Sequence, residues 1–139
     1  MLVVVTGGSG SGKSAFAETW IHQLCPDNKR YVATMIASDE ESKKRVMKHQ
    51  EQREQKGFIT IESPTHIEKL ELSGTEGVLL ECMSNLVANE LYDPMGVKRN
   101  VVQHVVKGVQ HLLNHTEHVV IVTNELFSGY EVSKEMKEY

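Results

Sequence analysis

The residues with the clearest chemistry form a glycine-rich stretch near the start of the chain. Residues 7–14 have the sequence GGSGSGKS, which matches the pattern GxxxxGK[ST] at every fixed position. Glycines let backbone N–H groups turn inward around phosphate oxygens, because no Cβ atom keeps the phosphate away. A lysine suits the outer phosphates and a serine hydroxyl suits magnesium. The pattern predicts a site for a nucleoside triphosphate with Mg²⁺, formed by Gly7, Gly8, Ser9, Gly10, Ser11, Gly12, Lys13 and Ser14.

The surroundings of this stretch support the prediction. An apolar, β-branched run over residues 2–6 precedes it, and a helical pattern over residues 13–24 follows it. In this arrangement the helix directs its positive N-terminal end at the same phosphate oxygens. The alternative is a glycine-rich turn with a chance lysine. The motif says almost nothing about the second substrate.

A second magnesium ligand is expected from an acid at the end of a buried strand. Glu81 directly follows the apolar residues 78–80, and Glu125 comes soon after the apolar run 119–122. Ligands bind at the carboxyl ends of parallel strands, so either acid could reach the site. We favour Glu81 because it abuts its apolar run. The alternative for both is a solvated or helix-capping acid.

Arg45, His49 and Arg53 are spaced four residues apart, which places them along one side of a helix. Two neighbouring guanidinium groups would disfavour the imidazolium form and keep His49 neutral. A neutral imidazole can attack phosphorus and hold the group covalently, while arginines bind phosphate oxygens. The spacing permits this chemistry but does not require it, because such a run is usually a solvated helix face. On that face Arg53 would be exposed and contribute little to stability.

Apolar runs and chain breaks predict the elements that position these residues. Strands alternating with helices predict one α/β domain over residues 1–139, with a mostly parallel sheet. The first run, residues 2–6, is typical of a strand buried on both faces. Strands are predicted at 2–6, 30–34, 58–62, 77–81 and 119–123, and helices at 13–24, 38–55, 83–92, 97–114 and 131–139, with a short one from 63–64.

Composition narrows the functional classes. The chain has 139 residues, 40% of them apolar and 24% charged, as in an ordinary soluble domain. Its net charge of −4 argues against nucleic-acid binding. The first apolar run is too short for a signal peptide or membrane span, and the two cysteines form no CxxC, so we expect a cytoplasmic protein.

His111 and His115 have metal-ligand spacing but no evident third ligand. No role is assigned to His22, His66, His104 or His118.

Several motifs in order resemble one known family, the bifunctional adenosylcobinamide kinase / adenosylcobinamide-phosphate guanylyltransferases of cobalamin biosynthesis. The resemblance spans nearly the whole chain. The matching blocks are Val4-Val5-Thr6-Gly7-Gly8 with residues 11–14, Tyr31-Val32-Ala33-Thr34, Asp39-Glu40-Glu41, Arg45-Val46 with His49 and Arg53, Thr60-Ile61-Glu62, Leu79-Leu80-Glu81-Cys82 with Asn89, and Val122-Thr123-Asn124-Glu125.

The resemblance implies a fold, a reaction and a set of site residues. It implies a P-loop NTPase-like, three-layer domain that assembles as a homo-oligomer, such as a trimer. A nucleotide, GTP or ATP, would phosphorylate adenosylcobinamide, and GMP from GTP would then reach the phosphorylated corrinoid through a GMP-His49 intermediate. Ser14 and Glu81 would hold Mg²⁺. Beyond the glycine-rich stretch, the implied nucleotide contacts are Ala33, Thr34, Met35, Gln50, Glu51, Gln52, Arg53, Glu62 and Glu81.

The chain also departs from the family pattern. Gly10 and Phe58 stand where the family usually has arginine and tryptophan, and residues 126–130 differ from its usual glycine-rich segment. The family's last helix and strand are missing after Tyr139, so we expect an uncovered sheet edge. Two alternatives stay open. One is a different small-molecule P-loop kinase, and the other is a non-catalytic nucleotide-binding protein.

Overall fold

Strands and helices alternate along the chain, as the sequence predicted. The structure, a computed structural model, describes residues 1–8 and 11–124. The described part is an α/β fold, which confirms the predicted class. Its elements are β1 (Leu2–Gly7), α1 (Lys13–Leu24), β2 (Lys29–Ala33), α2 (Glu40–Gln55), β3 (Phe58–Glu62), the 3₁₀ helix η1 (Ile67–Lys69), β4 (Gly77–Glu81), α3 (Met83–Tyr92), α4 (Val101–His115) and β5 (His118–Asn124).

The five strands form one sheet in the order β1-β5-β4-β2-β3, and every neighbouring pair is parallel. Parallel pairing brings the carboxyl ends of all strands to one edge of the sheet. Gly7 is paired with Asn124, and Ala33 lies between Glu81 and Glu62. The glycine-rich loop and the acid at the end of β4 therefore emerge at the same edge.

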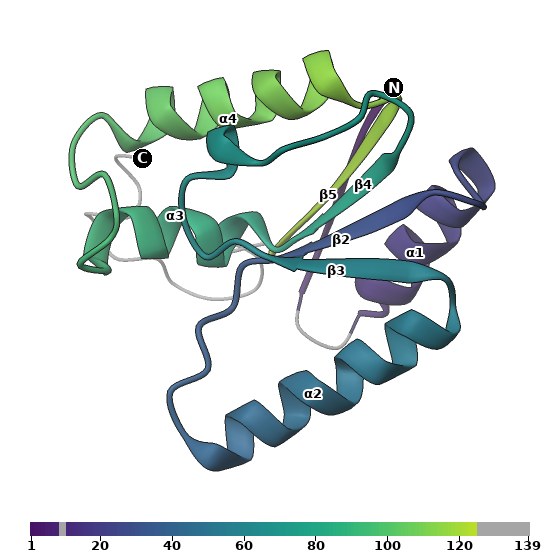
Figure 1. Cartoon of the computed structure of the whole chain (residues 1–139). Helices are drawn as coiled ribbons and strands as arrows, with labels where there is room; N and C mark the ends of the chain where they lie inside the picture. Colours follow the sequence, from purple (N-terminus) through teal and green to yellow (C-terminus); the bar gives the residue numbers. More distant parts are fainter. Residues whose placement is uncertain (9–10, 125–139) are drawn as a thin grey trace.

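Helices cover the sheet on two sides and create two apolar cores (Figure 1). α3, α4 and η1 pack on one face, where Leu86, Val105 and Ile67 meet Leu80. α1 packs on the other face, where Ala17 and Ile21 meet a second cluster containing Leu79. The alternation of Leu79 and Leu80 between the two cores is the period of a strand buried on both faces.

β1 differs from its prediction. Leu2 and Val4 are 44% and 53% exposed, so this strand is not buried on both faces. In the described part of the chain, β1 pairs with β5 and lies at the edge of the sheet. A β-branched apolar run indicates a strand, but it does not state how many neighbours that strand has.

Two predicted helix starts are also wrong. The helix predicted from residue 97 begins at Val101, because Lys98 and Asn100 have φ values of 69° and 53°. No α-helix starts at residues 63–64. Ser63 donates from its N–H to the Ala33 carbonyl at 2.8 Å, which continues the extended strand, and only the short η1 follows.

Other predictions fall outside the described residues, namely the acid Glu125 and the helix at 131–139. None of the described helices combines the length and apolarity that a membrane span requires.

Candidate active site

The glycine-rich loop lies between β1 and α1, as its motif requires. Gly12 precedes the first helical residue with φ 81°, a left-handed conformation that favours glycine. A Cβ atom on Gly7 would come within 2.6 Å of the Ser11 hydroxyl oxygen, so a larger residue at this position would require the Ser11 side chain to move. The Lys13 ammonium donates to the Gly8 carbonyl at 3.2 Å, which holds the side chain against its own loop. Ser9 and Gly10 lie outside the described residues.

Glu81 joins this loop to the centre of the sheet. It ends β4, and its carboxylate accepts hydrogen bonds from the hydroxyls of Ser14 and Tyr31. Burial raises the pKa of Tyr31, and the negative charge of Glu81 raises it further, so this phenol stays a donor. The Ser14 hydroxyl and the Glu81 carboxylate are hard oxygen ligands of the kind that Mg²⁺ prefers. These two residues fit a magnesium ion.

His49 faces the same place from α2. A cavity of about 230 Å³ is lined by residues of α1, β2, α2 and β4, together with the residue after α2. The helix contributes side chains at i, i+3 and i+4, and its C-cap residue adds i+7, which together have the spacing of one helical face. The lining residues are Ser14, Glu18, Tyr31, His49, Gln52, Arg53, Lys56 and Glu81.

Arg53 is buried, which corrects the sequence-based expectation of an exposed residue. The side chain is only 9% exposed, and its guanidinium carbon lies 3.7 Å from the centre of the Tyr31 ring. A planar, weakly hydrated guanidinium stacks well on an aromatic face, which explains why this cation tolerates burial. Among the described residues its Nε has no hydrogen-bond partner. Arg45, by contrast, is exposed.

The remaining predicted contacts do not line this cavity. Thr34 is fully buried, and its hydroxyl donates to the Cys82 carbonyl at 2.9 Å and accepts from the Cys82 N–H at 2.8 Å. Asn89 donates to the Thr34 carbonyl, so Thr34 already connects β2, β4 and α3. Ala33 and Glu62 end their strands, Met35 is exposed, and Gln50 and Glu51 lie on α2. The loop residues Gly7, Ser11, Gly12 and Lys13 line a separate hollow beside β1.

Comparison with known proteins identifies the family. A family model described as "Cobinamide kinase / cobinamide phosphate guanyltransferase" matches residues 3–138. The chain belongs to this family. It is 32% identical over 145 residues to the "Bifunctional adenosylcobalamin biosynthesis protein CobU" of Escherichia coli K12, covering 93% of this chain and 77% of that protein. Identity to the Salmonella typhimurium LT2 protein of the same name is 29% over 143 residues, with the same coverage. The resemblance in the motifs is confirmed.

Three of the residues that line the cavity of this CobU-family chain were not predicted from the sequence. Glu18 follows Ser14 by four residues on α1, and Lys56, directly after α2, follows His49 by seven residues, so helical spacing could have found both. The two form an ion pair at 2.8 Å that joins the helices. Tyr31 carried no such signal, because its role depends on the sheet placing β2 next to β4.

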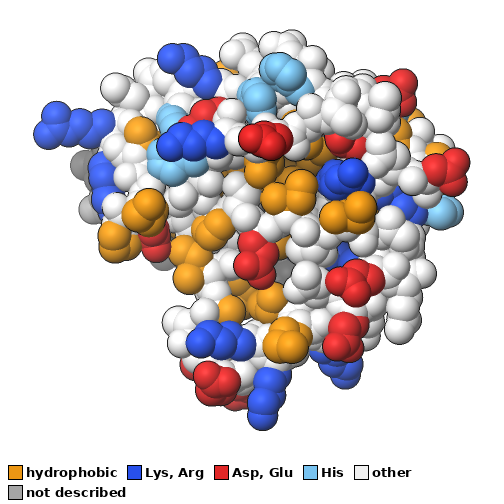
Figure 2. Space-filling model, in the orientation of Figure 1, with side chains coloured by type: hydrophobic (Ala, Val, Ile, Leu, Met, Phe, Trp, Pro, Cys, Tyr) orange, Lys and Arg blue, Asp and Glu red, His pale blue; other side chains and the backbone are white. Residues whose placement is uncertain are grey.

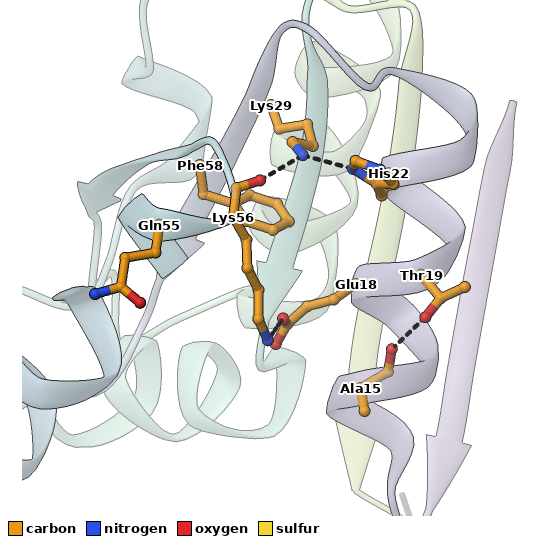
Figure 3. A pocket seen from close by; sticks show the side chains of 8 residues that line it. All are labelled: Ala15, Glu18, Thr19, His22, Lys29, Gln55, Lys56 and Phe58. Carbon is orange, nitrogen blue, oxygen red and sulfur yellow. Dashed lines mark hydrogen bonds and ion pairs between the residues drawn. The ribbon is translucent and has the colours of Figure 1, made fainter. Parts of the chain in front are cut away.

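A larger hollow of about 500 Å³ adjoins the cavity in this CobU-family fold and shares Glu18 and Lys56 with it (Figure 3). Beneath it Lys29 is only 1% exposed. Its ammonium donates to the Lys56 carbonyl at 2.7 Å and lies 2.8 Å from His22 Nδ1. Burial lowers the pKa of Lys29, while Asp27 opposes this shift. Lys29 therefore holds the C-terminal end of α2, the helix that carries His49, against β2 and α1.

Proposed function

We propose that this chain phosphorylates adenosylcobinamide and then transfers GMP from GTP to it through His49. One observation carries the proposal: His49 lines a single cavity with Ser14, the last residue of the phosphate loop, and with Glu81, which accepts a hydrogen bond from Ser14. Membership of the family supplies the class of reaction, kinase and guanylyltransferase. The positions of the side chains support separate roles for these residues in the kinase step and in the transfer step.

In the kinase step the loop residues and Lys13 would bind the triphosphate. Lys13 would exchange the Gly8 carbonyl for the outer phosphates, where its charge is most useful in the transition state. Ser14 and Glu81 would hold Mg²⁺, which neutralises phosphate charge when bound. Tyr31 keeps the Glu81 carboxylate directed at Ser14. Either GTP or ATP fits this description.

In the transfer step a neutral His49 would attack the α-phosphorus of GTP. A P–N bond forms as the P–O bond to pyrophosphate breaks. An oxygen of the corrinoid phosphate then attacks the same phosphorus, the P–N bond breaks, and His49 is released. Arg53, one turn further along α2, and Lys56, directly after the helix, bring positive charge to the same cavity and would balance the charge of the phosphate oxygens.

Labelling with α-³²P GTP and Mg²⁺ tests the proposal. We expect an acid-labile, base-stable label on the wild-type protein and none on His49→Ala. His115→Ala is the matched control, because this exposed histidine lies on α4, outside the cavity. A label that survives His49→Ala would overturn the role of His49. Transfer of γ-phosphate to an alcohol without any covalent label would identify a different small-molecule kinase.

We also expect a cytoplasmic homo-oligomer such as a trimer. Both cysteines are free and buried, as is usual in a reducing compartment. Within the described part of the chain β1 has one strand neighbour, and its exposed Leu2 and Val4 offer a face that a second copy would cover. Cross-linking and mass measurement in solution would decide the oligomeric state.

A further inference from the structure

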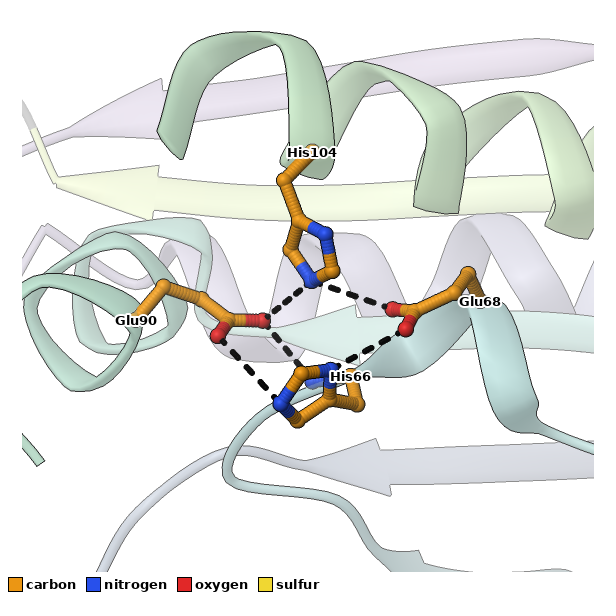
Figure 4. A group of neighbouring side chains, drawn as sticks. All are labelled: His66, Glu68, Glu90 and His104. Atoms are coloured by element: carbon orange, nitrogen blue, oxygen red, sulfur yellow. Dashed lines mark hydrogen bonds and ion pairs between the residues drawn. The ribbon is translucent and has the colours of Figure 1, made fainter. Parts of the chain in front are cut away.

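A second polar cluster lies on the face of the sheet away from the phosphate loop. It consists of His66, Glu68, Glu90 and His104, which come from the start of η1, from α3 and from the first turns of α4 (Figure 4). Several histidine side chains are visible in the upper half of the surface in Figure 2. None of these residues belongs to the nucleotide cavity, so the proposed reaction leaves the cluster unexplained.

The distances within the cluster match the coordination sphere of a small metal ion. His104 Nε2 lies 3.0 Å from a Glu90 oxygen and 3.2 Å from a Glu68 oxygen, and His66 Nδ1 lies 3.0 Å from the other Glu68 oxygen. One ligand atom from each of the four residues lies within 4.8 Å of all the others. Tetrahedral zinc with bonds of about 2.0–2.1 Å separates neighbouring ligands by about 3.3 Å.

Hydrogen bonding alone leaves this cluster incompletely satisfied. Among the described residues, His104 Nε2 and Glu68 Oε1 are buried atoms without a hydrogen-bond partner, although they lie 3.2 Å apart. Their approach is therefore too poorly aligned for a hydrogen bond. Figure 4 shows the His104 ring pointing between the two carboxylates, with His66 closing the opposite side. A cation between them would satisfy both atoms.

Surrounding contacts orient the ligands as in known metal sites. His66 Nε2 lies 2.8 Å from the Met95 carbonyl, so a neutral ring that donates there presents the lone pair of Nδ1 to the cluster. Glu90 is only 1% exposed and accepts backbone N–H bonds from His66 at 2.8 Å and Val97 at 3.0 Å. His66 has a left-handed backbone, with φ 57°, which is uncommon for a residue other than glycine.

We propose that His66, Glu68, Glu90 and His104 bind one divalent transition-metal ion, with Zn²⁺ the best fit. Two imidazoles and two carboxylates are nitrogen and oxygen donors that zinc accepts, while the imidazoles disfavour Mg²⁺ and Ca²⁺. The ion would join η1, α3 and α4. This inference does not depend on the proposed function, because it concerns residues outside the cavity.

A competing group, Cys25 with Glu117 and His118, is a poorer candidate. The positively charged N-terminus lies 3.4 Å from His118 Nδ1 and repels a cation. Burial, together with the charge of Glu117, raises the pKa of the Cys25 thiol and disfavours the thiolate that binds metals.

Zinc titration of the untagged, chelator-treated 139-residue chain tests the proposal by calorimetry. We expect one high-affinity site per chain. His104→Asn and Glu68→Gln should each weaken Zn²⁺ binding at least about 10-fold, since even the loss of a residue that only supports a ligand costs that much. His115→Asn is the matched control on the same helix and should bind like wild type.

Co²⁺ gives a second readout that does not depend on stability. We expect the strong visible bands of tetrahedral Co²⁺ in wild type and their loss in His104→Asn, with an unchanged far-ultraviolet circular dichroism spectrum. The proposal is overturned if wild type fails to bind Zn²⁺, if His104→Asn and Glu68→Gln bind it as wild type does, or if affinity falls in His118→Asn instead.

Discussion

The two polar clusters of this CobU-family chain lie on opposite faces of one sheet and are built in different ways. Ser14, Tyr31 and Glu81 meet at the carboxyl edge of the strands, next to a loop whose sequence is a motif. His66 and His104 meet through the packing of η1 against α4, and no motif connects them.

The clusters also differ in donors and access. The first presents oxygen ligands beside a cavity of about 230 Å³, which suits Mg²⁺ and a substrate that must enter and leave. The second surrounds its centre with nitrogen and oxygen atoms from four side chains, which suits an ion that stays. The difference follows from placement, because a strand edge beside a cavity leaves room for a ligand to exchange, whereas four side chains between packed helices can enclose a bound ion.

The largest expected effect comes from a substitution that impairs only the nucleotide site. Lys13→Ala should lower both γ-phosphate transfer and GMP labelling by about 10²–10³-fold, because both steps use the same triphosphate. Zn²⁺ binding should stay unchanged. Rates of both activities are compared with those of Lys107→Ala, an exposed lysine on α4. Retention of either activity would contradict a shared triphosphate site.

Glu81→Gln and Tyr31→Phe separate metal binding from positioning. Glu81→Gln removes the charge proposed to hold Mg²⁺ and should lower kcat by about 10²-fold. Tyr31→Phe keeps the ring under Arg53 and loses only the bond to Glu81, so a drop of about 10-fold or less is expected. Both rates are measured across a Mg²⁺ titration. Equal losses in the two variants would argue against Glu81 as the ligand.

Metal exchange should distinguish the clusters directly. After treatment with a chelator, Mg²⁺ alone should restore GMP labelling but not thermal stability. Zn²⁺ at 100 times its Kd should then raise Tm by about 5–10 °C, because it binds only the folded state. Differential scanning calorimetry measures the shift, and His104→Asn should abolish it. Recovery of Tm with Mg²⁺ alone would place the stabilising ion in the first cluster.

Arg53→Ala should destabilise the fold by about 1–2 kcal/mol, because the guanidinium packs on Tyr31 and is nearly buried. Arg45→Ala, an exposed change one turn before His49, should stay within about 0.5 kcal/mol of wild type. Urea unfolding measures both. Equal stabilities would mean that the stacking contributes nothing and that Arg53 acts on phosphate alone.

The smallest effect concerns Glu76, a buried carboxylate in neither cluster. Burial raises its pKa, but hydrogen bonds from Ser73 and Gly74 outweigh this and hold the pKa below its usual value. The stabilisation by the Glu76 carboxylate is therefore present above about pH 4.3 and is lost as pH falls through the lower pKa of the folded state.

Glu76→Gln should lower the free energy of unfolding by about 1 kcal/mol near pH 7, where the carboxylate is charged. The difference from wild type should shrink as the pH falls. Urea unfolding across pH, with the exposed Glu71→Gln as control, checks this. If the difference in unfolding free energy between Glu76→Gln and wild type stays constant across pH, the charge of Glu76 does not contribute to stability.

Local sequence determined the parts of this protein that neighbouring residues can build by themselves. The loop around Gly12 needs only a left-handed glycine before a helix, and α1, α3, β3 and β4 have the predicted bounds. The spacing of His49 and Arg53 likewise placed them on the same helix, although it left open what that helix faces.

Tertiary structure alone decided the order of the described strands, the place of β1 at the edge among them, the burial of Arg53 and the meeting of His66 with His104. Each depends on contacts between segments far apart in the chain, whose free energy comes from packing and burial that no local pattern records. The left-handed conformation at His66 comes with a hydrogen bond from its N–H to Glu90, 24 residues away, which no local pattern records.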